Sequence, residues 1–199
     1  MAGKSETAIK EAIESLIKQD LEKAESIIKF DNVIDELEHE INNKAIILIA
    51  KESPVASDLR KIIVALKISS EIERIADNAV NIAKSTLHIG TEKHIKEIVD
   101  IPIMMDLALE MLSESLHAFI EEDVELAKSC AQKDDKVDEM YGKLIRELMG
   151  YIQKYPAQTN QITQLAFVCR YIERLADYST NIAEHVIYLV TGKRYDLNA

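Results

Sequence analysis

The sequence has few residues that interrupt helices and no segment long enough to cross a membrane. Its 199 residues include only five glycines, three prolines and no tryptophan. This scarcity disfavours a fold of many strands and turns, and the abundance of Ile, Leu, Ala, Glu and Lys favours long helices. The longest apolar run, AIILIA at residues 45–50, is far shorter than the roughly 20 residues of a membrane span. The N-terminal MAGKSETAIK has no signal-peptide core.

Cysteine and positive charge are also scarce. Cys130 and Cys169 form no CxxC pair and lie in helical patterns, so we expect reduced core residues and a cytosolic protein. Lysine and arginine total 24 against 35 aspartates and glutamates, which gives a formal net charge of −11. This charge disfavours nucleic acid or anionic lipid as a partner and suits cations or basic protein patches, although acidity also aids solubility.

Three pairs of similar segments recur in the same order along the chain. The pairs are DLEKAES at Asp20 with DVELAKS at Asp123, DNVIDEL at Asp31 with DDKVDEM at Asp134, and ERIADNAVNIA at Glu73 with ERLADYSTNIA at Glu173. Their offsets are 103, 103 and 100 residues. Three collinear matches predict a duplicated unit. We place the first repeat at residues 1–90, the second at residues 95–199, and the best linker at residues 88–94.

Each repeat is predicted to contain three helices. The expected helices cover residues 5–19, 21–51, 55–88, 97–121, 123–153 and 158–189. Pro54 and Pro156 separate the second and third helix of each repeat, and Gly90 and Gly192 follow the third helices, where left-handed caps are common. Apolar residues at heptad spacing support bundle packing. The predicted fold class is all-α, with two tandem three-helix bundles and six long helices.

The third helix of each repeat carries an acidic stripe. Residues four apart lie on one slanting line of a helix, and here that line faces away from the apolar seam of its own helix. The stripes consist of Glu73, Asp77 and Asn81, and of Glu173, Asp177 and Asn181. Carboxylates at this spacing repel each other by a few tenths of a kcal/mol. The simplest interpretation of one stripe alone is therefore a helix face exposed to water. The recurrence at equivalent positions favours a function.

The second helix of each repeat carries further acids on one flank. They are Asp31 and Asp35 in the first repeat, and Asp134 and Asp138 in the second. Because the second and third helices should lie antiparallel, the stripes could converge on one surface groove per repeat. Carboxylate and amide oxygens suit Mg²⁺, Ca²⁺, Mn²⁺ or ferric iron, so we expect a multinuclear metal site in each groove. Arg74 and Arg174 could instead pair with these acids.

These segments resemble the PhoU family, the cytosolic regulators of phosphate uptake and phosphate-starvation signalling in bacteria. The resemblance covers nearly the whole chain, and three stretches carry it: residues 53–85, residues 171–193 and the spaced acids FDNVIDELEHEI at residues 30–41. It implies two three-helix bundles and multinuclear iron clusters, or Mn, Zn, Mg or Ca, at the surface. Under this resemblance Asp31, Asp35, Glu73, Asp77 and Asn81 form one cluster, and Asp134, Asp138, Glu173, Asp177 and Asn181 form the other.

The resemblance also implies a role. Family members are non-enzymatic negative regulators that contact the ATPase of the phosphate transporter and the membrane sensor histidine kinase, so that signalling stays off when phosphate is plentiful. We expect a cytoplasmic homodimer with no nucleic-acid partner and no membrane insertion. One alternative is a metal-independent acidic interaction module. A metal-dependent phosphohydrolase is less favoured, because the sequence has no phosphate-binding loop or nucleophile motif.

Two features depart from a perfect duplication. The first helix is expected to be several turns shorter than its counterpart, because residue 97 less the offset of 103 falls before Met1, whereas family members usually have a longer leader. In addition, Gln158 and Asn160 stand where the first repeat has Asp58 and Arg60. We therefore do not expect the two halves to bind partners equivalently.

Overall fold

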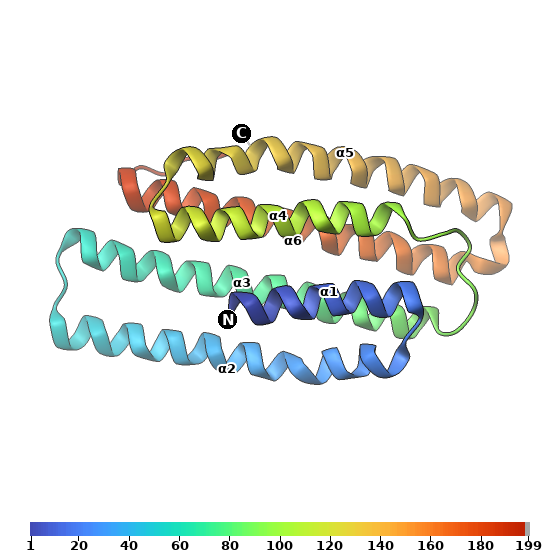
Figure 1. Ribbon diagram of the computed structural model, residues 1–199, viewed down its shortest axis with the longest axis horizontal. Coiled ribbons are helices and arrows are strands. Elements are labelled where there is room, and N and C mark those ends of the chain that lie inside the picture. Colours follow the sequence, from blue (N-terminus) through green and yellow to red (C-terminus); the bar gives the residue numbers. More distant parts are fainter. Residues whose placement is uncertain (198–199) are drawn as a thin grey trace.

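The computed structural model describes residues 1–197 and folds them into six long helices (Figure 1). The helices are α1 (Ala2–Lys18), α2 (Leu21–Glu52), α3 (Ala56–Ile89), α4 (Asp100–Glu121), α5 (Val124–Lys154) and α6 (Thr159–Thr191), with a short 3₁₀ turn, Pro156–Gln158, before α6. This described part of the chain contains no strand, so the all-α prediction is confirmed. None of its helices is both long enough and apolar enough to cross a membrane.

Aspartate caps define the start of the second helix in each repeat. The Asp20 carboxylate accepts a hydrogen bond from the Lys23 backbone N–H at 3.0 Å, and Asp123 Oδ1 accepts one from Leu126 N–H at 3.0 Å. Such a cap stabilises a helix by about 1 kcal/mol because it satisfies a backbone donor that has no partner within the helix. The first pair of repeated segments thus has a structural explanation and requires no site.

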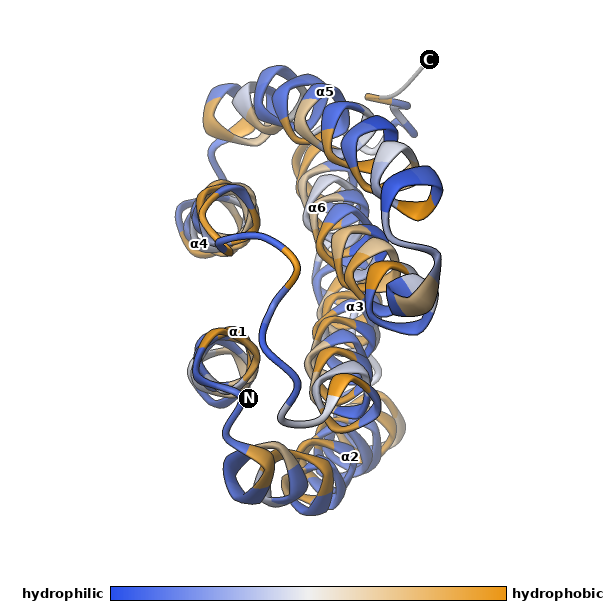
Figure 2. Cartoon of the chain, turned by 90° about the vertical axis from the view of Figure 1, so that its right-hand side faces the viewer, coloured by the Kyte–Doolittle hydropathy of each residue, from blue (hydrophilic) through white to orange (hydrophobic). Residues whose placement is uncertain are grey.

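The helices form a flat arrangement in which α3 and α6 are central. Seen end-on, these two lie side by side, α2 and α5 flank them, and α1 and α4 cover one face (Figure 2). α3 and α6 run antiparallel, and their ends are joined by matching contacts. Arg60 donates to the Leu189 carbonyl at 3.3 Å, and Asn160 donates to the His88 carbonyl at 3.0 Å. Asn160 and Arg60 occupy equivalent positions of the two repeats. Although the residue types differ, each donates a hydrogen bond to a backbone carbonyl near the end of the other central helix.

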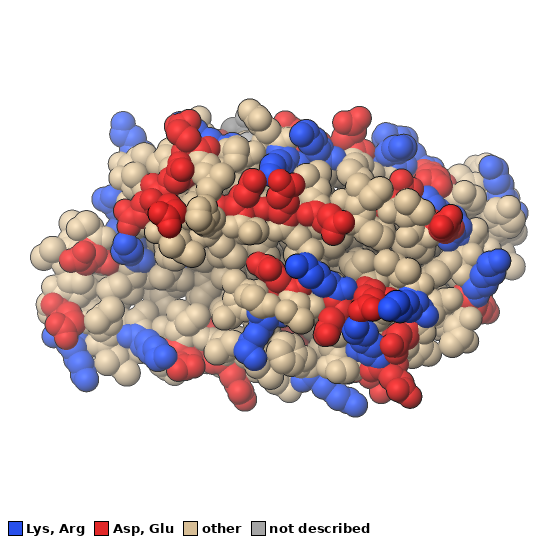
Figure 3. Space-filling view, viewed as in Figure 1, with Lys and Arg blue, Asp and Glu red and all other residues tan. Residues whose placement is uncertain are grey.

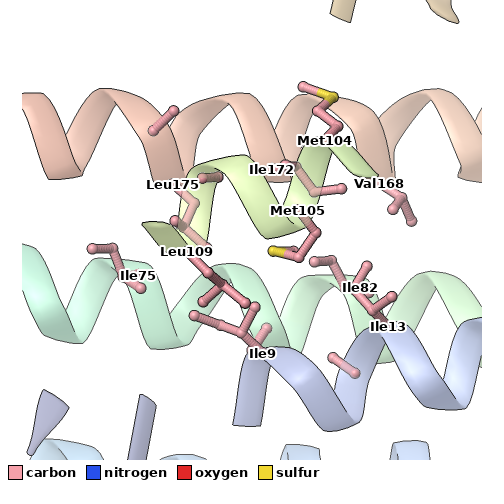
Figure 4. Packing of buried hydrophobic residues seen from close by; sticks show 14 of the residues in the cluster. Ile9, Ile13, Ile75, Ile82, Met104, Met105, Leu109, Val168, Ile172 and Leu175 are labelled. Atoms are coloured by element: carbon pink, nitrogen blue, oxygen red, sulfur yellow. The ribbon is translucent and has the colours of Figure 1, made fainter. Parts of the chain in front are cut away.

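One hydrophobic core runs through both repeats. Close to its centre, Ile9 of α1, Ile75 of α3, Leu109 of α4 and Leu175 of α6 lie near one another (Figure 4). Ile9, Ile75 and Leu175 are fully buried, and Leu109 is 8 % exposed. Cys130 and Cys169 are buried as predicted, and burial raises the pKa of their thiols to about 11 and about 12. The two repeats therefore share one core.

The linker between the repeats is longer than the sequence suggested. We expected the fourth helix to begin near residue 97, but α4 begins at Asp100. Gln161 of α6 holds the preceding segment: its Oε1 accepts from the Ile95 N–H at 2.6 Å, and its Nε2 donates to the Lys93 carbonyl at 3.3 Å. Because a buried side chain satisfies this backbone, and Ile95 packs against the core, these residues are stabilised outside a helix.

The first helix is shorter than its counterpart, as the duplication predicted, but by five residues and not by several turns. α1 has 17 residues and α4 has 22. Where α1 begins, α3 and α4 leave an apolar cavity of about 420 Å³ whose walls include Ile68, Ile72 and Phe119. On this face of the molecule, a largely uncharged area lies to the left of the start of α1, with charged side chains around it, and acidic side chains gather over α4 (Figure 3).

The shared core predicts that both repeats unfold together. We expect Leu175→Ala to lower the free energy of unfolding by about 2–5 kcal/mol, because it leaves a cavity at a fully buried position. Urea denaturation followed by circular dichroism should show one transition, shifted as a whole. Ile46→Ala, at a position 62 % exposed, is the control and should change stability by less than about 0.5 kcal/mol. Two separate transitions, of which only one moves, would contradict the shared core.

Candidate functional site

The first acidic groove lies between α2 and α3. We use this name for Asp31, Asp35 and Glu38 of α2 together with Glu73 and Asp77 of α3. The two helices run antiparallel, so the flank of one meets the stripe of the other, as the sequence predicted. Most of these side chains are half-buried, and Asp77 is exposed. Four of the five predicted residues of the first cluster are thereby brought together.

Burial and mutual repulsion both disfavour the charged carboxylates of this groove. Burial raises the pKa of Glu73 to about 7, and the charges of Asp77, Asp35 and Glu38 contribute to the rise. The pKa values of Asp31 and Asp77 are also raised, first by partial burial, which leaves part of the Asp77 side chain exposed, and then by neighbouring carboxylates. Lys84 and the two arginines that follow the glutamates offset only part of these rises. The groove therefore holds more negative charge than its surroundings neutralise.

The second acidic groove lies between α5 and α6 and contains Asp138, Glu173 and Asp177 together with Arg170. Burial raises the pKa of Glu173 to about 7, Asp177 and Asp138 add to the rise, and Arg170 opposes it. Arg170 forms an ion pair with Oε1 of Glu173. The other oxygen, Oε2, is buried and has no hydrogen-bond partner within residues 1–197. One oxygen of this carboxylate is therefore free to bind a further donor or a cation.

The remaining predicted residues lie at the edges of the grooves. Asp134 is 5 % exposed on α5, one turn from Cys130, whose pKa its charge helps to raise. Asn181 lies beside Glu71 of α3, across the boundary between the repeats, and offsets part of the rise that burial causes in the pKa of Glu71. Asn81 is half-buried one turn beyond Asp77. The structure thus places the two asparagines less centrally than the carboxylates.

The arginines next to the stripes interact elsewhere. Arg74 pairs with Glu71 at 3.4 Å, and Arg174 donates to the hydroxyl of Tyr178. The guanidinium groups of both also lie over the ring of Tyr178, with distances to its centroid of 6.0 Å and 5.5 Å. Tyr178 thus contacts one arginine from each repeat, and among the described residues neither arginine forms an ion pair with Glu73 or Glu173.

Sequence reasoning missed two contributors and misjudged the burial of one stripe. Glu38 joins the first groove, and its position one turn beyond Asp35 was the available signal. Arg170 joins the second groove through its spacing of three residues from Glu173. The second stripe was expected to face outwards, but Glu173 is only 8 % exposed. The position of the apolar face on a single helix does not show which other helices cover its polar face. α6 packs against α3, α4 and α5, and this packing buries Glu173.

The donor set of both grooves fits a hard metal cation. Several carboxylates lie close together in each groove, and a cation would remove their mutual repulsion. In the second groove, Oε2 of Glu173 has no hydrogen-bond partner among the described residues. Within the described residues, no three His, Cys, Asp or Glu side chains are already arranged to hold a metal ion. Carboxylates repel each other when no cation lies between them. A bound cation would draw these side chains together through rotation about their side-chain bonds.

Comparison with known proteins places this chain in a family. The PhoU domain model matches residues 1–86 and again residues 101–186. The chain belongs to the PhoU family. It is 41 % identical to a phosphate-specific transport system accessory protein PhoU homolog of Clostridium acetobutylicum, over all of this chain and 91 % of that protein. It is 42 % identical to the Aquifex aeolicus protein of the same name, over 97 % of this chain and 87 % of that one.

Solved structures of PhoU share the fold. PhoU from Pseudomonas aeruginosa superposes with a TM-score of 0.91 at 33 % identity, covering 96 % of this chain and 92 % of that one. The phosphate transport system regulatory protein PhoU from Streptococcus pneumoniae gives a TM-score of 0.90 at 32 % identity, covering 98 % and 92 %. The double match of the PhoU domain model confirms the duplication inferred from the three repeated segments.

The raised pKa values predict that stability falls as the pH rises. The carboxyl group of Glu73 has a pKa of about 7 in the folded chain, against an ordinary value of 4.5. Between pH 4.5 and pH 7 the folded chain therefore binds more protons at this group than the unfolded chain does. Stability supported by the protonated form is therefore present below pH 4.5 and lost by pH 7. We expect Glu73→Gln to be more stable than the unmodified chain at pH 8, by the order of 1 kcal/mol after solvent screening, and similar at pH 4.

This prediction is checked by urea denaturation at both pH values in the presence of a chelator. Glu52→Gln, which removes an exposed carboxylate at the end of α2, is the control and should leave the pH dependence unchanged. A Glu73→Gln chain that is less stable than the unmodified one at pH 8 would show that the carboxylate is favourably paired, contrary to the repulsion described above.

Proposed function

We propose that this chain is a cytoplasmic, non-enzymatic regulator of phosphate uptake that binds metal ions in its two acidic grooves. It would act as an adaptor between the ATPase of the phosphate transporter and the sensor histidine kinase, and would keep phosphate-starvation signalling off when phosphate is plentiful. The observation that carries the regulatory part is full-length similarity to proteins named as accessory proteins of the phosphate-specific transport system.

The accumulation of unneutralised carboxylates in both grooves supports the metal-binding part. In the first groove, Glu73 and Asp77 of α3 would hold the metal together with Asp31 and Asp35 of α2. In the second, Glu173, Asp177 and Asp138 would do so. Asn81 would be an outer donor of the first groove, and Asp134 and Asn181 would be outer donors of the second. Bound iron, manganese or another hard cation would supply positive charge, fixing the side chains and the surface that a partner meets.

A metal-independent role for the grooves has one observation in its favour. No three acidic, histidine or cysteine side chains among the described residues are yet arranged for one ion. In this alternative, the grooves receive lysine or arginine side chains of a protein partner, which would relieve the same repulsion. Metal binding and direct binding of basic side chains differ in two measurable ways. They differ in the metal content of the purified protein and in the effect of a chelator on partner binding.

Metal content separates them. We expect protein purified without chelator to carry iron, manganese or another divalent metal in stoichiometric amount, measured by elemental analysis. Asp77→Ala combined with Asp177→Ala should lose most of this metal, because both grooves lose a central ligand. Asp58→Ala combined with Asp106→Ala removes two exposed aspartates of α3 and α4 outside the grooves and should retain it. Substoichiometric metal in the unmodified protein would contradict metal binding.

The adaptor role is tested on the same variants. We expect the unmodified protein to capture the transporter ATPase and the sensor kinase from phosphate-replete cells, and less of them from phosphate-starved cells. The groove variant should capture less of both, whereas the Asp58→Ala, Asp106→Ala control should match the unmodified chain. Equal capture by the groove variant, with its metal lost, would make the metal dispensable for partner binding. Absence of both partners would contradict the adaptor role itself.

A further inference from the structure

A cavity of about 420 Å³ lies where the first half of α3 passes the last turns of α6. The segment of residues 193–197 closes one side of it. Gly192 adopts a left-handed conformation with a φ of +71°, which turns the chain, and the Leu197 N–H then donates to Glu184 of α6 at 2.8 Å. The cavity is separate from the carboxylates of both acidic grooves and has the size of sites for small ligands.

Two cations contribute to its wall, Lys67 of α3 and Arg194 of the C-terminal segment. Neither forms an ion pair with a carboxylate of the described chain. Lys67 does lower the pKa of Glu71 through space, but the ion pair of Glu71 is with Arg74. Lys96 and other lysines of this acidic chain bind glutamates directly, whereas Lys67 and Arg194 line the same cavity.

The rest of the wall combines aromatic rings with hydrogen-bonding groups. Tyr188 and Tyr195 contribute their rings, and Arg60 fixes Tyr188 by lying over it with 5.6 Å between guanidinium carbon and ring centroid. His185 is neutral at physiological pH, since burial, followed by the charge of Lys67, lowers its pKa to about 4. Glu184 is the one acidic side chain of the wall, and a carboxylate at such a place can accept hydrogen bonds from hydroxyl groups.

The internal duplication does not explain this cavity. At the offset of 100 residues, the counterpart of Lys67 is Phe167, that of His185 is Ser85 and that of Tyr188 is His88. The acidic stripes recur in both repeats, whereas the cations and rings of the cavity occur on one side only. The cavity is therefore a feature of its own and not a consequence of the repeated helix pattern.

We propose that this cavity binds a nucleotide, with the phosphate on Lys67 and Arg194 and the base against Tyr188 and Tyr195. Two cations that lack carboxylate partners suit a phosphate group, which accepts charge-assisted hydrogen bonds. Tyrosine rings suit the face of a base, and Glu184 suits the hydroxyl groups of a ribose. This inference goes beyond the regulatory and metal-binding roles and does not rest on them.

The test is isothermal titration calorimetry of the full chain with AMP, adenosine and inorganic phosphate, in low salt and with EDTA so that metal in the grooves contributes nothing. We expect AMP to bind and both adenosine and phosphate to bind at least about tenfold more weakly, because each lacks half of the contacts. Lys67→Gln and Arg194→Gln should each weaken AMP about tenfold or more. Both side chains are exposed, so neither change should unfold the protein.

Lys44→Gln, on the exposed face of α2, is the matched control and should bind AMP as the unmodified chain does. Tyr195→Ala should weaken AMP and leave the weak binding of phosphate unchanged. Absence of AMP binding at millimolar concentration would overturn the proposal, and so would equal binding by the Lys67→Gln, Arg194→Gln double variant. Phosphate bound as tightly as AMP would overturn the assignment of a nucleotide, and adenosine bound as tightly would overturn the role of the cations.

Discussion

The antiparallel packing of α3 against α6 is the contact on which the rest of this structure depends. Each of the two helices is buried on the side of its own repeat and again on the side of the other, so apolar positions such as Ile75 and Leu175 meet in one core. The flanking helices α2 and α5 then have only one place to pack. Polar side chains of α3 and α6 that cannot enter this core are left facing the flanking helices, and there the acidic grooves form.

The sequence was sufficient for the parts that depend on one helix at a time. Pro54 and Pro156 located the breaks between helices, and apolar residues that recur at heptad spacing, such as Ile72 and Ile82, are buried. The contacts of individual side chains were harder to foresee. The ion pair of Arg170 with Glu173 depends on the rotamers of two residues of α6, and the hydrogen bonds of Gln161 to the linker join residues far apart in the chain. The burial of Glu173 has the same origin, since three helices surround α6.

The two grooves are related by duplication but differ in charge. The first contains Glu38, whose counterpart at an offset of 103 is Tyr141, and the second contains Arg170, whose counterpart at an offset of 100 is Ser70. The first groove therefore gathers more carboxylates, and the second has an internal cation. A cation binding to the second groove competes with Arg170 for Glu173, whereas the first groove presents no such competitor at the matching position. By this argument, the first groove should bind a cation more tightly.

Carboxylates that repel each other lower the stability of the folded chain, and nothing in the packing requires them. Glutamine or serine at the positions of Glu73 or Asp77 would keep the helix and remove the repulsion. The same unfavourable arrangement nevertheless recurs in the second repeat, although a nearby position differs between the repeats, with Ser70 in the first and Arg170 in the second. Features that oppose stability and still occur at both equivalent places are expected at functional sites. The stability that the shared core supplies is what allows the chain to carry both grooves.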